Sequence, residues 1–204
     1  MSNLLNAVVG NNNDEIYEEL RREYYENRIL VLNDEIDDFV IDDFALWILK
    51  WNRDDKDVPI DKRRPIRLFI SSPGGNTFSA NILIDVILQS KTPIIGVGLD
   101  LVASAAYLIF LACHERVCFK NSVFLQHEGD MAIENSRSKF KQTNQFFEEL
   151  ENRAKDYILS RTNMTSEFYD SIYEVEYWIL PDKAKELGVI HKVIGEDIDI
   201  DYVY

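Results

Sequence analysis

The fold is set by the stretch Ser71-Ser72-Pro73-Gly74-Gly75, which separates a short apolar run from a longer one. The run before it, residues 66–70, reads Ile-Arg-Leu-Phe-Ile and predicts a buried strand. The run after it, residues 78–88, has the apolar spacing of a helix. Glycines on such a strand-to-helix turn leave backbone N–H groups open to a group that develops negative charge. The turn is therefore a candidate oxyanion hole, and a tight turn without chemistry is the alternative.

A second strand-to-helix junction contains Ser104. Residues 94–98 predict a short strand that ends in a turn at 100–102, and the apolar stretch 105–113 predicts a buried helix. Ser104 then lies at the start of that helix, where a lone serine is usually a small residue or an N-cap. It becomes a candidate nucleophile only if a basic partner lies nearby.

Histidine is the first partner to consider, and the chain has only three. His127 follows residues 122–126, which predict a strand, so its ring is expected at a strand end. His114 lies in a polar connection and is expected to face solvent, and His191 lies in a predicted C-terminal strand over 188–193. Taken alone, each of these histidines is more typical of a structural residue.

Strands and helices alternate along the chain, which predicts an α/β fold with a mainly parallel sheet. Such sheets place their sites at strand ends and helix starts. The longest predicted helix covers residues 134–161, and either packs on its own domain or projects from it. Its apolar stripe consists of Phe140, Phe147, Leu150, Ala154 and Tyr157.

Composition limits the classes of function. The 204 residues suit one domain, and the net charge of −14 argues against a nucleic-acid surface, with Lys62-Arg63-Arg64 as a local exception. No stretch approaches the ~20 apolar residues of a membrane span, and residues 1–10 do not read as a signal peptide. The two cysteines read as core thiols of a reducing compartment, so we expect a cytoplasmic protein. The sequence has neither metal-ligand spacing nor a phosphate-binding loop, so we expect no metal and no cofactor.

These elements together resemble the ClpP family, the proteolytic subunits of the ATP-dependent Clp protease, which are serine peptidases of the ClpP/crotonase fold. The resemblance runs from about residue 16 to residue 194. The motifs that carry it are Arg28-Ile29-Leu30-Val31-Leu32, Glu35-Ile36-Asp37-Asp38, Ser72-Pro73-Gly74-Gly75, Ala103-Ser104, Asn121-Ser122 leading to His127, and Ala184-Lys185-Glu186-Leu187-Gly188-Val189-Ile190.

The resemblance implies a set of site residues. Ser104 is the expected nucleophile, His127 the general base and then acid, and the backbone N–H groups of Gly75 and Ala105 the oxyanion hole. The family's triad aspartate corresponds to Glu176 here, and Ser-His-Glu triads occur on other folds. Asp170, on a predicted helix over 166–172, is a weaker alternative.

The resemblance also implies an organisation and partners. It predicts a ClpP/crotonase fold of repeated β-β-α/β-α units in one domain, residues 1–204, with an N-terminal segment and helix (1–27), a head (28–132 and 162–195), a protruding handle helix (133–161) and an acidic tail (196–204). It implies a homo-oligomeric ring, heptamer or tetradecamer, that degrades unfolded proteins or peptides supplied by an AAA+ unfoldase of the Clp type. ATP would then belong to the unfoldase.

Two alternatives stay open at this stage. Departures from the family pattern at Asp100, Val175, Glu176 and residues 128–133 allow a catalytically inactive ring subunit with a structural or regulatory role. A crotonase-type acyl-CoA enzyme would share the fold and the backbone oxyanion hole, but it does not explain Ser104 and His127 at peptidase positions.

Overall fold

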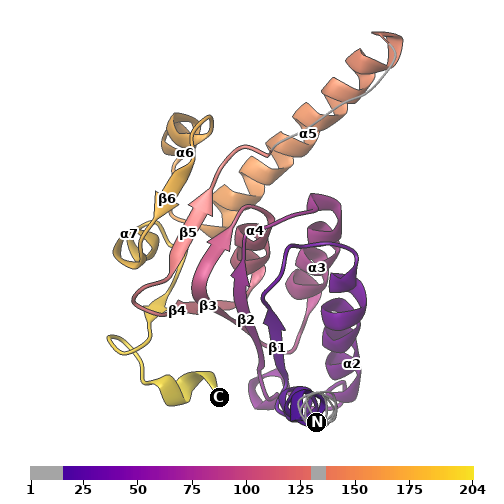
Figure 1. Ribbon diagram of the computed structural model, residues 1–204, viewed down its shortest axis with the longest axis vertical. Helices are drawn as coiled ribbons and strands as arrows, with labels where there is room; N and C mark the ends of the chain where they lie inside the picture. Colours follow the sequence, from indigo (N-terminus) through magenta and orange to yellow (C-terminus); the bar gives the residue numbers. More distant parts are fainter. Residues whose placement is uncertain (1–15, 130–136) are drawn as a thin grey trace, which may run out of the picture.

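The computed structural model describes residues 16–129 and 137–204, and its centre is a seven-stranded sheet (Figure 1). The order β1-β2-β3-β4-β7 is parallel throughout, β5 pairs parallel with β3, and β6 pairs antiparallel with β5. The strands are β1 (Ile29–Leu32), β2 (Ile66–Ser72), β3 (Ile94–Ala103), β4 (Glu115–Cys118), β5 (Val123–Gln126), β6 (Tyr177–Ile179) and β7 (Lys192–Val193). The α/β fold with a mainly parallel sheet is thereby confirmed.

Helices connect these strands. Residues 16–26 are helical, and short turns of π-helix (η1, Ile41–Ala45) and 3-10 helix (η2, Ile60–Lys62; η3, Ile200–Val203) supplement the longer helices. The α-helices are α2 (Leu46–Asp54), α3 (Thr77–Gln89), α4 (Ala105–Ala112), α5 (Arg137–Arg161), α6 (Ser166–Ile172) and α7 (Pro181–Glu186). Within the described ranges, no helix is both long and apolar enough to span a membrane.

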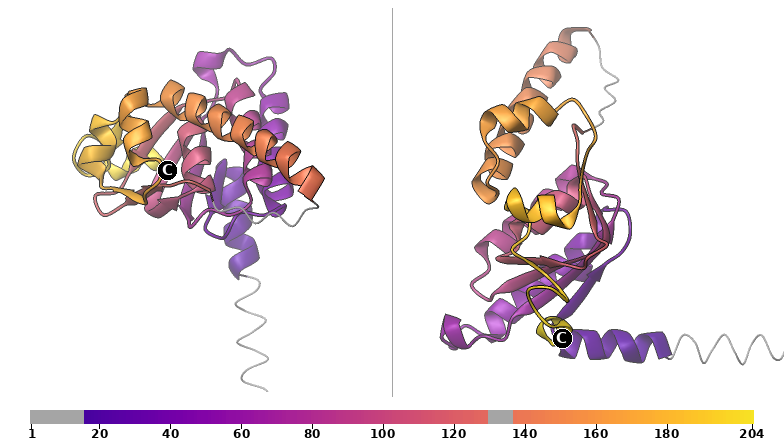
Figure 2. Two further views of the ribbon diagram at one scale, coloured as in Figure 1. Left: turned by 90° about the horizontal axis from the view of Figure 1, so that it is seen from above. Right: turned by 90° about the vertical axis from the view of Figure 1, so that its left-hand side faces the viewer.

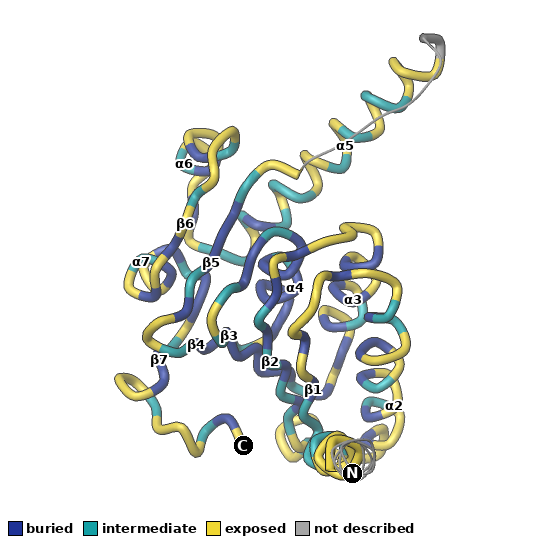
Figure 3. The backbone as a smooth tube through the Cα atoms, viewed as in Figure 1, coloured by how far each residue is buried: buried dark blue, intermediate teal, exposed yellow. Residues whose placement is uncertain are grey.

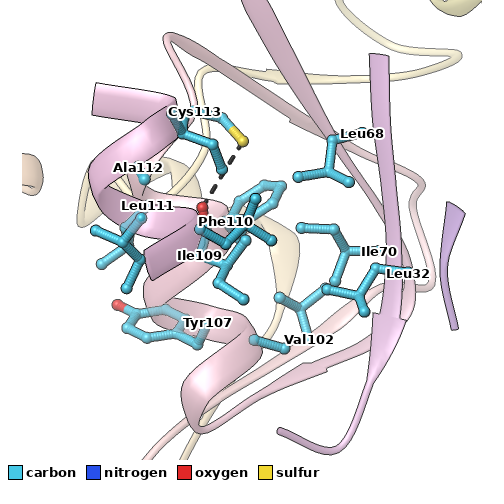
Figure 4. Packing of buried hydrophobic residues seen from close by; sticks show 14 of the residues in the cluster. Leu32, Leu68, Ile70, Val102, Tyr107, Ile109, Phe110, Leu111, Ala112 and Cys113 are labelled. Carbon is cyan, nitrogen blue, oxygen red and sulfur yellow. Dashed lines mark hydrogen bonds between the residues drawn. The ribbon is translucent and has the colours of Figure 1, made fainter. Parts of the chain in front are cut away.

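The main core lies between the sheet and the helices α2, α3 and α4. β2 alternates between buried and half-buried residues, so Leu68 and Ile70 face α4 while Phe69 faces the other side. α4 is buried along almost its whole length, and Figure 4 shows Ile109 and Phe110 directed at the strands. A smaller apolar cluster on the opposite face includes Val203 of η3. The sheet therefore has its principal core on the face that α2, α3 and α4 cover.

β3 changes its partner along its length. Its first half, Ile95 to Gly98, pairs with β4, and its second half, Leu101 to Ala103, pairs with β5. The sequence-based turn at 100–102 was therefore wrong, because pairing with β5 keeps this segment extended. The predicted C-terminal strand over 188–193 was also too long, since only Lys192 and Val193 pair, with β4.

The predicted strand and helix on either side of the Pro-Gly-Gly turn are confirmed. β2 and α3 match the runs at 66–70 and 78–88, and Asn76 caps α3 by accepting hydrogen bonds from the Phe78 and Ser79 amides at 2.9 and 3.2 Å. α6 covers the predicted helix over 166–172.

α5 packs on the core at one end and extends away from it at the other (Figures 1 and 2). Ile158 is buried near its C-terminal end, and the Tyr157 hydroxyl donates a hydrogen bond to the Leu108 carbonyl of α4 at 2.9 Å. Toward the other end Phe140 is 52% exposed, and Figure 3 shows the exposed residues gathered there. Residues 133–136 of the predicted handle lie outside the described residues, and the division into head, handle and tail stays a prediction.

A mostly buried ion pair fastens α2 to the start of β1. Two nitrogens of Arg28 donate to the two oxygens of Asp55 at 2.6 and 2.7 Å, and Thr92 donates to Asp55 at 3.1 Å. The hydrogen bonds from Arg28 lower the pKa of Asp55. Bidentate geometry and burial make this pair stronger than an exposed one.

We predict that Asp55→Asn lowers the free energy of unfolding at pH 7 by about 2 kcal/mol, because it leaves the Arg28 guanidinium partly unpaired. A carboxyl whose pKa is lowered in the fold stabilises the fold above its unfolded-state pKa and loses that contribution in acid. The difference from the unsubstituted protein should therefore shrink as the pH falls below about 4, as urea titrations at several pH values would measure. Asp54→Asn, which breaks the exposed pair with Lys50, is the control and should cost less than about 0.5 kcal/mol. Equal losses for both variants would contradict the prediction.

Candidate active site

Ser104 has a strained backbone at the junction of β3 and α4. Its φ is 54° and its ψ is −125°, a combination that L residues rarely adopt. Its amide donates a hydrogen bond to the Leu125 carbonyl of β5 at 3.0 Å. Ser104 is the residue before α4, yet its side chain forms no capping hydrogen bond, so the simple N-cap interpretation was wrong. The strain presents the side chain to the cavity described below, as in other nucleophile turns between strand and helix.

The Pro-Gly-Gly turn approaches Ser104 so closely that only glycine fits. Gly74 has a φ of 100°, and a Cβ built there would lie 2.6 Å from the Ser104 Cβ and 2.8 Å from the Ala103 carbonyl oxygen. Gly75 has a φ of 143°, and its Cβ would lie 2.4 Å from the Ile36 carbonyl oxygen. A side chain at either position would force apart the segments that form this turn.

Two backbone amides beside Ser104 lack partners within the described residues. Ile36 bridges the turn by donating to the Gly74 carbonyl and accepting from the Asn76 amide, both at 2.7 Å, and this bridge does not use the Gly75 amide. Ala105 is the first residue of α4, where an amide has no acceptor inside the helix. These are the two amides that the family resemblance implies as donors to an oxyanion.

His127, which follows the end of β5, lies at the same edge of the sheet as Ser104. Ala103 is in register with Leu125, and Ser72 is in register with Val102, so the ends of β2, β3 and β5 meet at one edge. His127 directly follows β5 and is half-buried there. Its predicted position at a strand end near other strand ends is thus confirmed. His114 and His191 each accept a hydrogen bond from a backbone amide through Nδ1, and neither lines the cavity beside Ser104.

A cavity of about 420 Å³ opens beside these groups. Gly75, Ser104, Ala105 and His127 all line it. Its remaining walls come from α3 and α4, from α5 through residues such as Leu150 and Ile158, and from Tyr169 and Tyr173. A larger hollow of about 690 Å³ lies between the helix over 16–26 and β1, and none of the four site residues lines it. The smaller cavity is therefore the one that suits chemistry at Ser104.

The strand register sets Glu176 opposite His127, but the two side chains form no hydrogen bond among the described residues. β6 pairs with β5 so that Tyr177 is opposite Gln126, and continuing this antiparallel register by one residue sets Glu176 opposite His127. Glu176 is exposed, does not line the cavity, and makes no hydrogen bond to His127 within the described residues. Asp170, the weaker candidate, is exposed and forms an ion pair with Lys155 at 2.5 Å.

The other departures from the family pattern fall outside the cavity or at its rim. Asp100 is exposed, and hydrogen bonds from Ser71 and the Leu101 amide lower its pKa. Val175 is also exposed, at 53%. Glu128 and Gly129 line the cavity, whereas residues 130–133 lie outside the described residues.

Sequence reasoning missed three residues that line the cavity. Tyr107, Gln126 and Tyr173 each place a side-chain oxygen in a buried position without a hydrogen-bond partner. A tyrosine inside the apolar run 105–113 and a glutamine inside a strand were the only signals, and both suggest ordinary core positions. Across the described ranges, no three His, Cys, Asp or Glu side chains form a group suited to a metal ion.

Comparisons with known proteins show which proteins this chain is similar to. The ATP-dependent Clp protease proteolytic subunit 2 of Treponema pallidum is 27% identical over 139 residues, which cover 67% of this chain and 70% of that protein. Subunit 1 of Corynebacterium jeikeium is 24% identical over 192 residues, covering 93% and 97%. A ClpP1 variant from Listeria monocytogenes has a similar structure, with a TM-score of 0.75 at 20% identity, covering 91% of this chain and 99% of that one.

The family comparison covers nearly the whole chain. The Clp protease family matches residues 10–197, a range that includes β1 to β7 and all the candidate site residues. With the structural likeness, this match confirms the resemblance that the motifs indicated. The chain belongs to the Clp protease family.

Proposed function

We propose that this protein is a serine endopeptidase that cleaves unfolded polypeptides through an acyl-enzyme, with Ser104 as nucleophile, His127 as general base and acid, and Glu176 as the acid that orients His127. One observation carries the proposal: Ser104 has a strained backbone and an uncapped side chain, beside two unpartnered amides and in the cavity that His127 also lines.

The chemistry follows from these positions. His127 removes the proton from the Ser104 Oγ as this oxygen attacks the peptide carbonyl carbon. The Gly75 and Ala105 amides donate hydrogen bonds to the oxygen that becomes negative. His127 then gives the proton to the leaving amine, and the C–N bond breaks. A water molecule, deprotonated by His127, hydrolyses the ester and releases Ser104.

Glu176 completes this arrangement after a change of side-chain rotamer. The strand register supports its role, because it continues the β5–β6 pairing to a position opposite His127. From there its carboxylate accepts a hydrogen bond from the imidazole, fixes one tautomer and stabilises the imidazolium.

Family membership supports the partners of the reaction. The relatives are named as proteolytic subunits of an ATP-dependent protease, and this sequence has no phosphate-binding loop. We therefore assign ATP use to a separate AAA+ unfoldase of the Clp type, in the cytoplasm. The protein itself forms a homo-oligomeric ring, a heptamer or a tetradecamer.

Replacement of the site residues tests the proposed reaction. Ser104→Ala and His127→Ala should each lower peptide-cleavage kcat by about 10⁴-fold or more, and Ser104→Ala should abolish labelling by a fluorophosphonate. Glu176→Gln should lower kcat by about 10⁴-fold, because the imidazole loses its orienting charge. A fluorogenic peptide and intact-protein mass spectrometry measure the two effects.

Asp170→Asn is the matched control for the acid, since Asp170 pairs with Lys155, and it should retain the activity of the unsubstituted protein. A loss at Asp170 with none at Glu176 would reverse the assignment of the acid. Absence of labelling in an assembled ring, even with an unfoldase added, would overturn the peptidase proposal and favour the inactive subunit.

The close approach of Gly74 to Ser104 yields a second test. Gly74→Ala should lower kcat by about 100-fold or more, because the added methyl group displaces Ser104 from its amide donors. Gly195→Ala is the control: its φ is also positive, at 87°, but an added Cβ would meet no atom within 4 Å. If both variants keep folded circular dichroism spectra and lose the same activity, backbone strain alone explains the loss and the proposed geometry is wrong.

A further inference from the structure

Unpartnered buried oxygens gather at the cavity beside Ser104. The described part of the chain has four buried side-chain polar atoms without a hydrogen-bond partner. Three of them, Tyr107 Oη, Gln126 Oε1 and Tyr173 Oη, belong to residues that line this cavity. Burying a polar atom without a partner costs free energy, so such atoms need a specific explanation. A bound group with complementary chemistry would supply the missing hydrogen bonds.

These three residues come from separate elements. Tyr107, in α4, is only 1% exposed, and Figure 4 shows its hydroxyl directed away from the strands that carry Leu68 and Ile70. Gln126, the last residue of β5, is 3% exposed. Strand alternation gives it the same side as Phe124, whose ring packs 5.2 Å from that of Phe110 in α4. Tyr173 follows α6. The three residues therefore contribute to the cavity from separate elements, with their oxygens buried behind its walls.

The charged carboxylates that line the cavity are those of Glu128 and Glu151, and among the described residues no lysine or arginine lines it. Lys155 lies outside, with its Nζ 5.7 Å from the centroid of the Tyr169 ring. Burial raises the pKa of the Tyr173 hydroxyl, and the nearby Glu151 and Glu128 carboxylates raise it further. Burial and these two carboxylates, together with Asp170, have the same effect on Tyr169. An anionic substrate group would be repelled here and a cationic one attracted.

The remaining walls suit a long side chain with an apolar stem. Leu150 and Ile158 provide aliphatic contacts, and the rings of Tyr107, Tyr169 and Tyr173 provide aromatic ones. Aromatic faces attract a cation, while the stem of lysine or arginine packs on apolar surface. A volume of about 420 Å³ leaves room for either side chain.

We propose that this cavity selects a lysine or arginine side chain on the acyl side of the scissile bond, and that Tyr107 and Gln126 determine this specificity. The inference rests on the proposed function, because Ser104 must attack the neighbouring carbonyl. A cationic group offers several N–H donors, and the Gln126 Oε1 and the Tyr107 hydroxyl oxygen can accept hydrogen bonds from them. An aliphatic side chain of the same length would leave them unpaired, and a site built for hydrogen bonds discriminates against such a substrate.

Two matched reagents test the preference directly. Peptidyl diphenyl phosphonates that differ only in carrying lysine or norleucine next to phosphorus have the same stem, but only one has the ammonium group. In each, Ser104 Oγ attacks phosphorus, a P–O bond to phenoxide breaks, and phenol leaves with the serine proton. The rate of mass gain of the assembled protein reports the selection. We expect the lysine reagent to react about tenfold faster or more.

Variants locate the source of the preference. Tyr107→Phe and Gln126→Leu should each lower the lysine-to-norleucine rate ratio by about fivefold, the effect of one lost hydrogen bond. Gln126→Glu should raise the ratio, because it adds an anion at the same position. Tyr157→Phe is the control: its hydroxyl already donates to the Leu108 carbonyl and does not line the cavity, so the ratio should not change.

The outcomes separate this inference from the proposed function. A small alkyl fluorophosphonate, which carries no side chain for the cavity, reports whether Ser104 is nucleophilic at all. If it labels Ser104 while norleucine reacts as fast as lysine, the specificity is wrong and the proposed function stands. A lysine preference that Tyr107→Phe and Gln126→Leu leave unchanged would also overturn the inference. If folded, assembled protein is not labelled at Ser104, the proposed function fails and the inference fails with it.

Discussion

The double pairing of β3 is the constraint on which the candidate site depends. The first half of β3 pairs with β4 and the second half pairs with β5. The hydrogen bond from the Ser104 amide to the Leu125 carbonyl continues the second pairing beyond the end of β3. This bond fixes Ser104 relative to His127, two residues after Leu125. If β3 had stayed with β4, Ser104 and the end of β5 would lie at separate edges of the sheet. Strand pairing therefore determines the relative positions of Ser104 and His127.

The strain at Ser104 is maintained by its surroundings. A positive φ at a serine costs about 1–3 kcal/mol, and without the surrounding structure the backbone at this position would adopt a negative φ. Here α4 is buried on nearly all sides, and Gly74 lies against Ser104 with no room for a Cβ. The segments on either side of Ser104 are thus fixed by packing that does not involve its hydroxyl. That arrangement leaves the hydroxyl free for a substrate, in accord with strained residues at functional sites.

The sequence predicted those features that depend on local pattern. The turn at Pro73-Gly74-Gly75, the helix after Ser104 and the strand before His127 have clear apolar and glycine signals, and each was found where expected. The length of β3 could not be predicted, because its last residues stay extended only through pairing with β5, a tertiary contact. The unpartnered oxygens of Tyr107 and Gln126 were hidden for a similar reason: their sequence positions read as core, and only the packing of α4, β5 and α6 opens a cavity at them. Glu176 came from family resemblance alone, and the register supports its position but not yet its contact with His127.

The central claim is that the amides of Gly75 and Ala105 face the oxygen that becomes negative when Ser104 reacts. A crystal structure of the assembled protein after reaction with a fluorophosphonate tests this most directly, because the phosphonyl oxygen imitates that oxyanion. We predict a covalent bond to Ser104 Oγ, with the phosphonyl oxygen about 3 Å from the backbone nitrogens of both Gly75 and Ala105. An adduct on another residue, or a phosphonyl oxygen directed away from both amides, would contradict the account.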